Sequence, residues 1–284
     1  MILTLDFGNS QLFGGVFQDG ELTVRFRKPS RPSPSSDELG LFLRAVLREN
    51  GRNPADVGQI ALCSVVPDAI YAMRSCCRKY FGIDPFILQA GAKTGLKVRY
   101  RNPLEVGADR IANAIGAVSL YPDRNLVVVD LGTATTFDVV GAERTFLGGI
   151  IVPGLRMSVE ALETKTARLP NVEIVRASEL VGRSTIECVQ SGIYFGNLAI
   201  IRELTRAIRA QAFHGEPVLV IGTGGFSQMY EHEQVFDVLL PDLVLLGLER
   251  ALVLNPAGSP RWTAGARPAR GGDVSPAPHH GRAE

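Results

Sequence analysis

The sequence has no uninterrupted apolar run of about eighteen residues, the length that a membrane-spanning helix needs. Its formal net charge is only +1, so no excess of positive charge favours binding to nucleic acid or to a membrane surface. The opening residues MILTLDFG contain neither a basic segment nor a small-residue cleavage site, which predicts that no signal peptide is present. We therefore expect neither a nucleic-acid partner nor a membrane partner.

Cysteine is also scarce. The four cysteines, Cys63, Cys76, Cys77 and Cys188, do not have the spacing of a zinc site, and the adjacent pair is a poor framework for disulfides. This pattern favours a reduced, cytoplasmic compartment. The 284 residues are 45% hydrophobic and 21% charged, which is typical of a globular protein with room for two modest domains.

A motif that occurs twice is the most informative feature. LDFGNSQLFGGV at 5–16 returns as VDLGTATTFDVV at 129–140. At a constant spacing of 124 residues, the two copies align Asp6 with Asp130, Gly8 with Gly132, Phe13 with Phe137, and Val16 with Val140. Two copies of one motif predict a duplicated domain.

A tight β-hairpin would explain either copy alone, because Gly8-Asn9 is good turn chemistry. The repetition favours a functional interpretation of the same hairpin. In it, backbone N–H groups and the side chains of Asn9 and Ser10 face a phosphate, and Asp6 faces its cation. We expect two such hairpins, facing each other, to form a cleft for a nucleoside triphosphate.

Hydrophobic periodicity predicts an α/β protein with mixed β-sheets. Beyond the two hairpins, we expect strands at 21–28, 59–67, 85–89, 144–152 and 217–225. We expect a helix after the capping box of Ser35 and Glu38, and further helices at 68–81, 106–121, 154–164, 184–213 and 242–254. The predicted halves are residues 1–118 and 119–256.

The composition changes near Ser259, where Pro, Gly, Ala and Arg replace aliphatic residues. We expect residues 257–284 to be a disordered tail, because they have too little apolar surface to offset the entropy of ordering. His279 and His280 in this tail are more typical of solvated histidines than of a metal site.

Two further segments contain residues suited to phosphoryl transfer. In VGADR at 106–110, Asp109 is a candidate general base and Arg110 a candidate partner for an anionic substrate, although acidic bias in a first helical turn explains Asp109 equally well. Tyr100 lies just upstream and is either a pocket residue or a core tyrosine. In IGTGGF at 221–226, the glycines allow a base or ribose to approach the backbone closely.

Together these motifs resemble those of the type III pantothenate kinases, members of the actin-like ATPase superfamily, over residues 1–255. The matching segments are DFGNS, GADR, DLGTATTFD, GGIIVPG at 148–154, GRSTIECVQSG at 182–192, and TGG at 223–225. Ser10 differs from the threonine usual in that family and keeps the hydroxyl group. The resemblance implies duplicated ribonuclease H-like domains whose mixed sheets are flanked by helices.

It also implies ATP-dependent phosphorylation of the primary hydroxyl of pantothenate, the first step toward coenzyme A, with Asp109 as general base. ATP would be contacted by Asp6, Phe7, Gly8, Asn9, Ser10, Gln11, Gly132, Thr133 and Gly224. Pantothenate would be bound by Tyr100, Gly107, Ala108, Arg110 and Thr185. Asp6 would lie near Mg²⁺, and Asp130 would hold K⁺ or NH₄⁺. The family is dimeric, with GGIIVPG near the interface.

Two other functions stay open from the sequence. One is phosphorylation of a different small molecule on the same fold, against which only GADR and Thr185 argue. The other is a regulatory protein that uses ATP as a switch, although the sequence has neither a helix-turn-helix pattern nor a basic stripe for direct binding to DNA.

Overall fold

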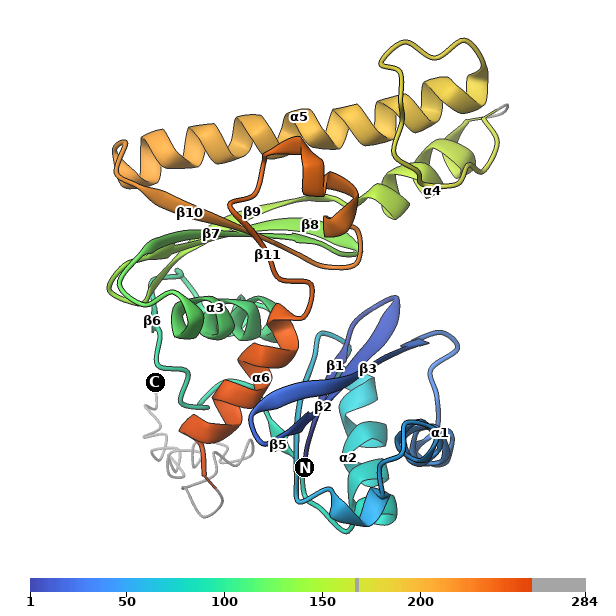
Figure 1. Ribbon diagram of the computed structural model, residues 1–284, viewed down its shortest axis with the longest axis vertical. Helices are drawn as coiled ribbons and strands as arrows, with labels where there is room; N and C mark the ends of the chain where they lie inside the picture. The colour runs from blue at the N-terminus through green and yellow to red at the C-terminus, as the bar shows by residue number, and fades with distance from the viewer. Residues whose placement is uncertain (167–168, 257–284) are drawn as a thin grey trace, which may run out of the picture.

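The computed structural model describes residues 1–166 and 169–256, which form two mixed β-sheets with helices on their faces (Figure 1). This arrangement confirms the predicted α/β class. The predicted tail at 257–284, with His279 and His280, lies outside the described residues. None of the helices in the described part of the chain is long and apolar enough to cross a membrane.

The first sheet has the strand order β3-β2-β1-β4-β5. The strands are β1 (Ile2–Phe7), β2 (Gln11–Gln18), β3 (Glu21–Pro29), β4 (Gln59–Ser64) and β5 (Phe86–Ile87). The first three form an antiparallel meander, and β4 and β5 add to it in parallel. Apolar side chains on the outer face of this sheet pack against α1 (Ser36–Glu49) and α2 (Pro67–Phe81).

The second sheet has the order β11-β10-β7-β8-β9-β6. The strands are β6 (Lys97–Val98), β7 (Asn125–Leu131), β8 (Ala134–Gly141), β9 (Thr145–Pro153), β10 (Val218–Thr223) and β11 (Val238–Leu239). The long helix α5 (Thr185–Phe213) crosses its outer face, and α4 (Leu155–Lys165) lies beyond the end of the sheet (Figure 1).

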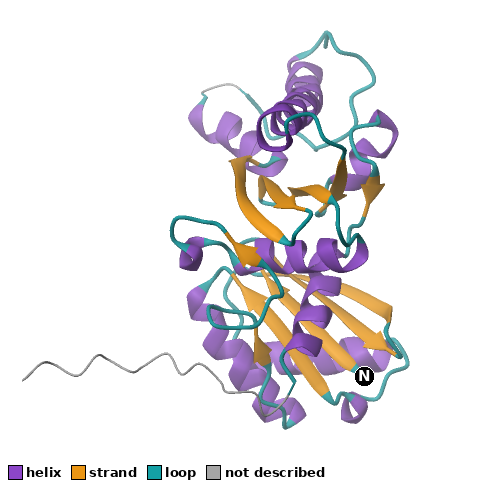
Figure 2. Cartoon of the chain, turned by 90° about the vertical axis from the view of Figure 1, so that its left-hand side faces the viewer, coloured by secondary structure: helices purple, strands orange, loops and turns teal. Residues whose placement is uncertain are grey.

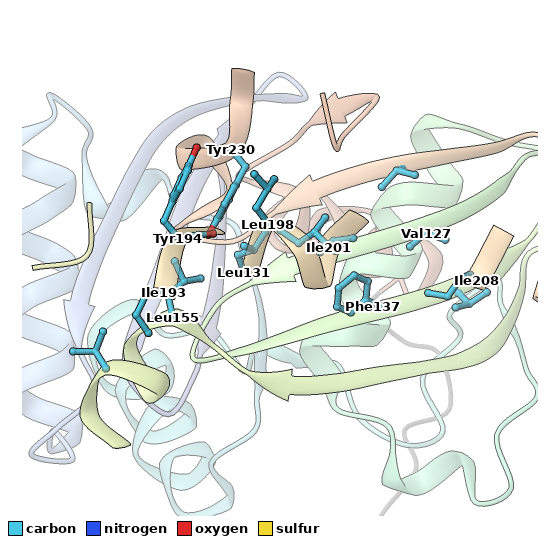
Figure 3. Close-up of a cluster of buried hydrophobic side chains, with 14 of the residues drawn as sticks. Val127, Leu131, Phe137, Leu155, Ile193, Tyr194, Leu198, Ile201, Ile208 and Tyr230 are labelled. Atoms are coloured by element: carbon cyan, nitrogen blue, oxygen red, sulfur yellow. The ribbon is translucent and has the colours of Figure 1, made fainter. Parts of the chain in front are cut away.

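The core under α5 is closed by an aromatic pair (Figure 3). Tyr194 of α5 stacks on Tyr230 of a 3-10 helix at Ser227–Glu233, with ring centroids 5.2 Å apart and planes 7° from parallel. The hydroxyl of Tyr194 donates a 2.6 Å hydrogen bond to Glu233. This contact fixes the segment that follows the glycine-rich end of β10 against α5.

Two helices lie between the sheets, α3 (Ala108–Leu120) and α6 (Leu243–Leu254) (Figures 1 and 2). They cross at two glycines, because a Cβ on Gly116 would come 2.8 Å from the Leu243 carbonyl oxygen and a Cβ on Gly247 would collide with the Ala112 carbonyl. Bare backbone at both positions lets the axes approach closely. The pair joins the halves, since α6 packs on the first sheet and α3 contacts both.

The two halves also exchange segments. The helix α6 is C-terminal in sequence, yet its side chains pack with those of β1, β2 and β4. The short strand β6 precedes α3 in sequence and pairs in parallel with β9 of the second sheet. The predicted boundary at residue 118 falls two residues before the end of α3. As a limit between independently folding units, it stays a prediction.

The repeat exists in the structure, but its second hairpin is one residue shorter than the first. Asp6 pairs with Phe13, whereas Asp130 pairs with Thr136 and Phe137 pairs with Val129. Paired residues share a face, so Phe13 faces the space between the sheets and Phe137 faces α5.

The predicted equivalence of Phe13 with Phe137 is therefore wrong, and that of Val16 with Val140 is wrong for the same reason. Val16 packs under α1 and α2 on the outer face, whereas Val140 packs beside α3. A slip of one residue moves every later side chain of a strand to the other face. The match of Asp6 with Asp130 precedes the slip and stays valid.

Most predicted elements are confirmed with small changes at their ends. The capping box is present, with Glu38 N–H donating to Ser35 Oγ and Ser35 N–H donating to the Glu38 carboxylate. The helix expected from residue 68 begins at Pro67, as proline at a first helical position allows. The strand expected over 85–89 is limited to Phe86–Ile87, and the helix expected from residue 106 begins at Ala108.

Candidate active site

The two predicted phosphate hairpins meet between the sheets. The hydroxyls of Ser10 and Thr133 lie 2.9 Å apart and share a hydrogen bond that joins the first half of the chain to the second. The first turn is closed by the Gly8 N–H donating to the Gln11 carbonyl at 3.0 Å. Asn9, Ser10, Gln11 and Thr133 are all exposed. Their polar groups are therefore accessible to a ligand.

Three carboxylates lie beside these turns, each from a different element. Asp6 is near the end of β1, Asp130 near the end of β7, and Asp109 in the first turn of α3. All three are partly buried. The pKa of Asp6 is raised to about 7, first by burial and then by the negative charge of Asp109. Burial and Asp109 likewise raise the pKa of Asp130 to about 6.

Asp109 is fixed by its own helix. Its Oδ1 accepts a 2.8 Å hydrogen bond from the Arg110 N–H, and a Cβ at Gly107 would come 2.5 Å from the same oxygen. Gly107 thus leaves room for the carboxyl group at the start of α3. Burial raises the pKa of Asp109, against the opposing effect of the Arg110 N–H. A carboxyl group with a raised pKa is suited to accepting a proton near neutral pH.

Sequence reasoning missed two side chains that hold the carboxylates. Cys63 of β4 donates its Sγ–H to Asp6 Oδ1 at 3.2 Å, and Asn113 of α3 donates to Asp130 Oδ2 at 2.8 Å. Both residues are buried. A cysteine in an apolar strand and an asparagine one turn after Asp109 carry no motif, so only the pairing of β1 with β4 and the packing of α3 reveal them.

Arg110 is held by Asp138, which the sequence analysis included only as the last residue of the motif DLGTATTFD. Its Nε donates to Asp138 Oδ1 at 2.7 Å, and the two side chains are 8% and 0% exposed. Burial alone would lower the pKa of Arg110, but Asp138 offsets this and raises it. A Cβ at Gly149 would come 2.5 Å from Arg110 Nη2, and Tyr100 lies beside the guanidinium. Of the predicted pantothenate-site residues, Gly107 and Arg110 therefore contact Asp109, and Tyr100 contacts Arg110.

The glycine-rich segment after β10 lies against the second hairpin. Gly224 has φ +85°, and a Cβ there would collide with Asp130 Oδ1 and the Leu131 backbone. Phe226 N–H donates to the Leu131 carbonyl at 3.2 Å. This places the glycine-rich segment 221–226, where a base or ribose is predicted to approach, beside Asp130. Only glycine fits there, because both its conformation and the space around it exclude a side chain.

Thr185 is the predicted site residue that the structure separates from the rest. It is exposed at the first position of α5, the helix that runs on the side of the second sheet away from α3 (Figure 1). The N-cap of this helix is Ser184, whose side chain accepts a hydrogen bond from the Glu187 N–H. The neighbouring segment 148–154 does reach the site, since a Cβ at Gly154 would collide with the Thr133 carbonyl.

The donor atoms of the site suit a hard cation that is shared with phosphate. Within residues 1–166 and 169–256, no group of three His, Cys, Asp or Glu side chains forms a metal site by itself. Mg²⁺ is usually bound through one or two carboxylates, with phosphate and water completing its shell. Asp6 and Asp130 supply oxygen ligands of this kind. Burial and the negative charge of Asp109 raise the pKa values of both groups, so a bound cation would favour their charged forms.

Comparison with solved structures shows which known proteins share this fold. A structure from Campylobacter jejuni, described as a conserved putative Baf family transcriptional activator, aligns with a TM-score of 0.55 and 19% identity over 89% of this chain and 98% of that one. A putative 2-dehydro-3-deoxygalactonokinase from Sinorhizobium meliloti aligns with a TM-score of 0.55 and 14% identity over 89% and 98%. At these identities the likeness shows the fold alone, which is the arrangement of two mixed β-sheets with helices on their faces.

Sequence comparison gives the family. The profile of the type III pantothenate kinases matches residues 2–207. A type III pantothenate kinase of Legionella pneumophila (strain Corby) is 52% identical over 257 residues, 90% of this chain and 100% of that protein. The enzyme of Elusimicrobium minutum is 46% identical over 255 residues, 90% and 99% of the two chains. The chain belongs to the type III pantothenate kinase family and is a phosphotransferase, as the motifs predicted.

Proposed function

We propose that this protein transfers the terminal phosphoryl group of ATP to the primary hydroxyl of pantothenate, the first step toward coenzyme A. The observation that carries the proposal is the meeting of two hairpins, joined through Ser10 and Thr133, with the three carboxylates Asp6, Asp109 and Asp130. Phosphoryl transfer depends chiefly on positioning and on electrostatic stabilisation, and this arrangement supplies groups for both.

Asp109 is the proposed general base. It accepts the proton of the pantothenate hydroxyl as the hydroxyl oxygen attacks the terminal phosphorus. The bond from that phosphorus to the bridging oxygen breaks, and ADP leaves with the electron pair. The partial burial that raises the pKa of Asp109 makes its carboxylate a better proton acceptor than a solvated aspartate.

The hairpins are the proposed phosphate sites. Phe7 ends β1 directly before the first turn, and Gly8 and Gly132 lie in the two turns. Backbone N–H groups of these turns donate to phosphate oxygens. The exposed side chains of the turns, those of Asn9, Ser10, Gln11 and Thr133, add further donors. Gly224 gives the nucleoside close access to the backbone beside Asp130.

The proposed pantothenate site lies around α3. Arg110 binds the carboxylate of pantothenate, since Asp138 takes the Nε edge of the guanidinium and leaves other donors. Gly107 and Ala108 begin α3, and Tyr100 lines the pocket next to Arg110. This set distinguishes pantothenate from substrates without an anionic group.

Mg²⁺ near Asp6 and a monovalent cation, K⁺ or NH₄⁺, at Asp130 complete the proposal. A bound cation neutralises phosphate charge and the charge of the neighbouring carboxylates. Cys63 and Asn113 each hold one oxygen of their aspartate and leave the other oxygen for a ligand. Both contacts orient the carboxylates before any ligand arrives.

We further propose that the protein is a cytoplasmic homodimer. Large apolar side chains are exposed on β9, on α4 and around the start of α5, namely Leu147, Ile151, Met157, Leu180, Val181 and Ile186. An exposed apolar surface of this kind is typical of an interface. A second copy is also the simplest source of Thr185 at the pantothenate site, because α5 and α3 lie on opposite faces of the second sheet. Light scattering of the purified chain, with Ile151→Asp as the disrupting variant, tests the dimer.

The experiment that tests the function is ATP turnover by the purified protein, with and without pantothenate, in K⁺ and in Na⁺. We expect ADP and a phosphorylated pantothenate to form in equal amounts, and only when pantothenate is present. A regulatory use of ATP predicts nucleotide binding without this product. A panel of other small hydroxy acids and sugars distinguishes another kinase activity on the same fold.

A further inference from the structure

Arg27 of β3 lies in a row of residues that leads to the first phosphate hairpin. Asp6 of β1 pairs with Phe13 of β2, and Phe13 pairs with Arg27. Directly paired residues on antiparallel strands point to the same face of a sheet. Phe13 packs with residues of α3 and α6, so this face is the one that looks toward the second half. Arg27 therefore points into the space between the halves, two strands from Asp6.

The guanidinium of Arg27 is positioned but not paired. Its Cζ lies 3.8 Å from the centroid of the Phe13 ring, a stacking geometry that orients a long side chain. Among the residues that the structure describes, Arg27 forms no ion pair within 4.0 Å and donates no hydrogen bond. Arg25, two residues earlier on the same strand, instead donates to Asp242 at 2.6 Å. The donors of Arg27 are thus available to a ligand.

The charges around Arg27 favour an anionic ligand bound together with a cation. Burial lowers the pKa of Arg27, while Asp242, Asp6 and Asp130 raise it. In return, Arg27 lowers the pKa values of both Asp6 and Asp130. The positive charge of Arg27 therefore acts on the carboxylates of both hairpins. A guanidinium stays protonated at any pH relevant to an enzyme, so it is a permanent cation in this space.

We propose that Arg27 is a further catalytic residue, whose guanidinium donates hydrogen bonds to the terminal phosphoryl group of ATP during its transfer. The inference rests on the proposed function. Two features favour the phosphoryl group over other parts of the substrates. Arg27 shares its row with Asp6 of the first hairpin. The nucleoside is instead expected at Gly224 and pantothenate at Arg110, which lie against β7 and β8 of the second sheet.

The step leaves Arg27 unchanged. The proton of the attacking hydroxyl goes to Asp109, the phosphorus exchanges its bridging oxygen for the hydroxyl oxygen, and ADP leaves with the electron pair. Arg27 contributes only hydrogen bonds and charge to the non-bridging oxygens, where charge is concentrated as the group transfers. Its planar fork of donors matches two such oxygens, which an ammonium group does not.

The test uses the full chain with Arg27→Gln and Arg27→Lys, and with Arg25→Gln as the matched control. Arg25 has the same charge on the same strand and face, but its donors are engaged by Asp242. We expect Arg27→Gln to lower kcat by about 10²–10³-fold with little change in the KM for pantothenate, as for loss of one transition-state donor. Arg27→Lys should recover part of the loss. Arg25→Gln should retain most of the activity, because exposed ion pairs contribute little.

A binding measurement separates this role from a structural one. With Mg²⁺ present, Arg27→Gln should weaken binding of a non-hydrolysable ATP analogue by about 10–100-fold and leave ADP binding nearly unchanged. Equal losses for both nucleotides, or wild-type kcat in Arg27→Gln, would overturn the assignment. The ratio of the two losses in affinity, for the ATP analogue and for ADP, does not depend on pantothenate. It therefore tests Arg27 even if the wild type fails to phosphorylate pantothenate. That failure would refute the proposed function and not the assignment of Arg27.

Discussion

Replacing Asp6 by asparagine should stabilise the free protein while inactivating it. The carboxyl group of Asp6 has its pKa raised from 3.8 to about 7 by burial and by Asp109. A raised acid pKa means that the folded state holds the proton more tightly than the unfolded state does. The contribution of Asp6 to stability is therefore largest at low pH, declines as the pH rises from about 4 to about 7, and is constant above that range.

The magnitude follows from the shift. About three pKa units correspond to about 4 kcal/mol of lost stability at pH 8, at about 1.4 kcal/mol per unit. Asp6 is only partly buried, so screening by solvent reduces the figure to about 2 kcal/mol. Asparagine removes the charge and still accepts the hydrogen bond from Cys63. For a protein of this size, about 2 kcal/mol raises the thermal midpoint by roughly 4–8 °C.

The assay is thermal unfolding of Asp6→Asn and wild type at pH 8 and at pH 5. The gain should be full at pH 8 and clearly smaller at pH 5, where the folded wild type is already largely protonated. Asp19→Asn is the control, since Asp19 is an exposed turn residue at φ 52°, which asparagine tolerates. A gain that is absent, negative or equal at the two pH values would refute the reasoning.

Three other substitutions test the site and the fold. Asp109→Asn should lower turnover by about 10²–10⁴-fold while calorimetry shows unchanged ATP binding, and near-normal turnover would rule it out as general base. The wild type should be faster in K⁺ than in Na⁺, and Asp130→Ala should lose that difference with most of the activity; equal rates in the two salts would contradict the cation site. Gly247→Ala should cost about 1–3 kcal/mol or more in denaturant unfolding, because a Cβ collides with the Ala112 carbonyl where α6 crosses α3. Gly196→Ala, at an open position of α5, is its control and should not destabilise the protein.

Much of the candidate site could be proposed from the sequence because its residues lie in short contiguous motifs. The aspartate and glycine of each hairpin occur together in the chain, and turn chemistry is local. Asp109 and Gly107 are similarly close, as are Gly224 and the end of β10. The contacts that bring these motifs together are not local in sequence. The hydrogen bond from Ser10 to Thr133 spans 123 residues, and no periodicity in either segment predicts its length or its partner.

The side chains that hold the site were harder to predict. Cys63 and Asn113 become important only because β4 pairs with β1 and because α3 packs between the sheets. Arg27 is one of several cations on an ordinary amphipathic strand. Its proposed role depends on three strands that bring Asp6, Phe13 and Arg27 into one row. Strand pairing is set by contacts far apart in sequence, so composition and spacing carry little information about it.

The sequence by itself determined the class of fold, the duplicated hairpins and the chemistry of their residues, because hydrophobic period and turn composition act over a few residues. Only the tertiary structure decided the register and the exchange of segments. One residue fewer in the second turn places Phe137 under α5 while Phe13 faces the cleft. The helix α6 leaves the second sheet to pack on the first, because two glycines let it cross α3 there. Side-chain volume and backbone approach across the core fix both features, and neither is encoded in any single segment of the chain.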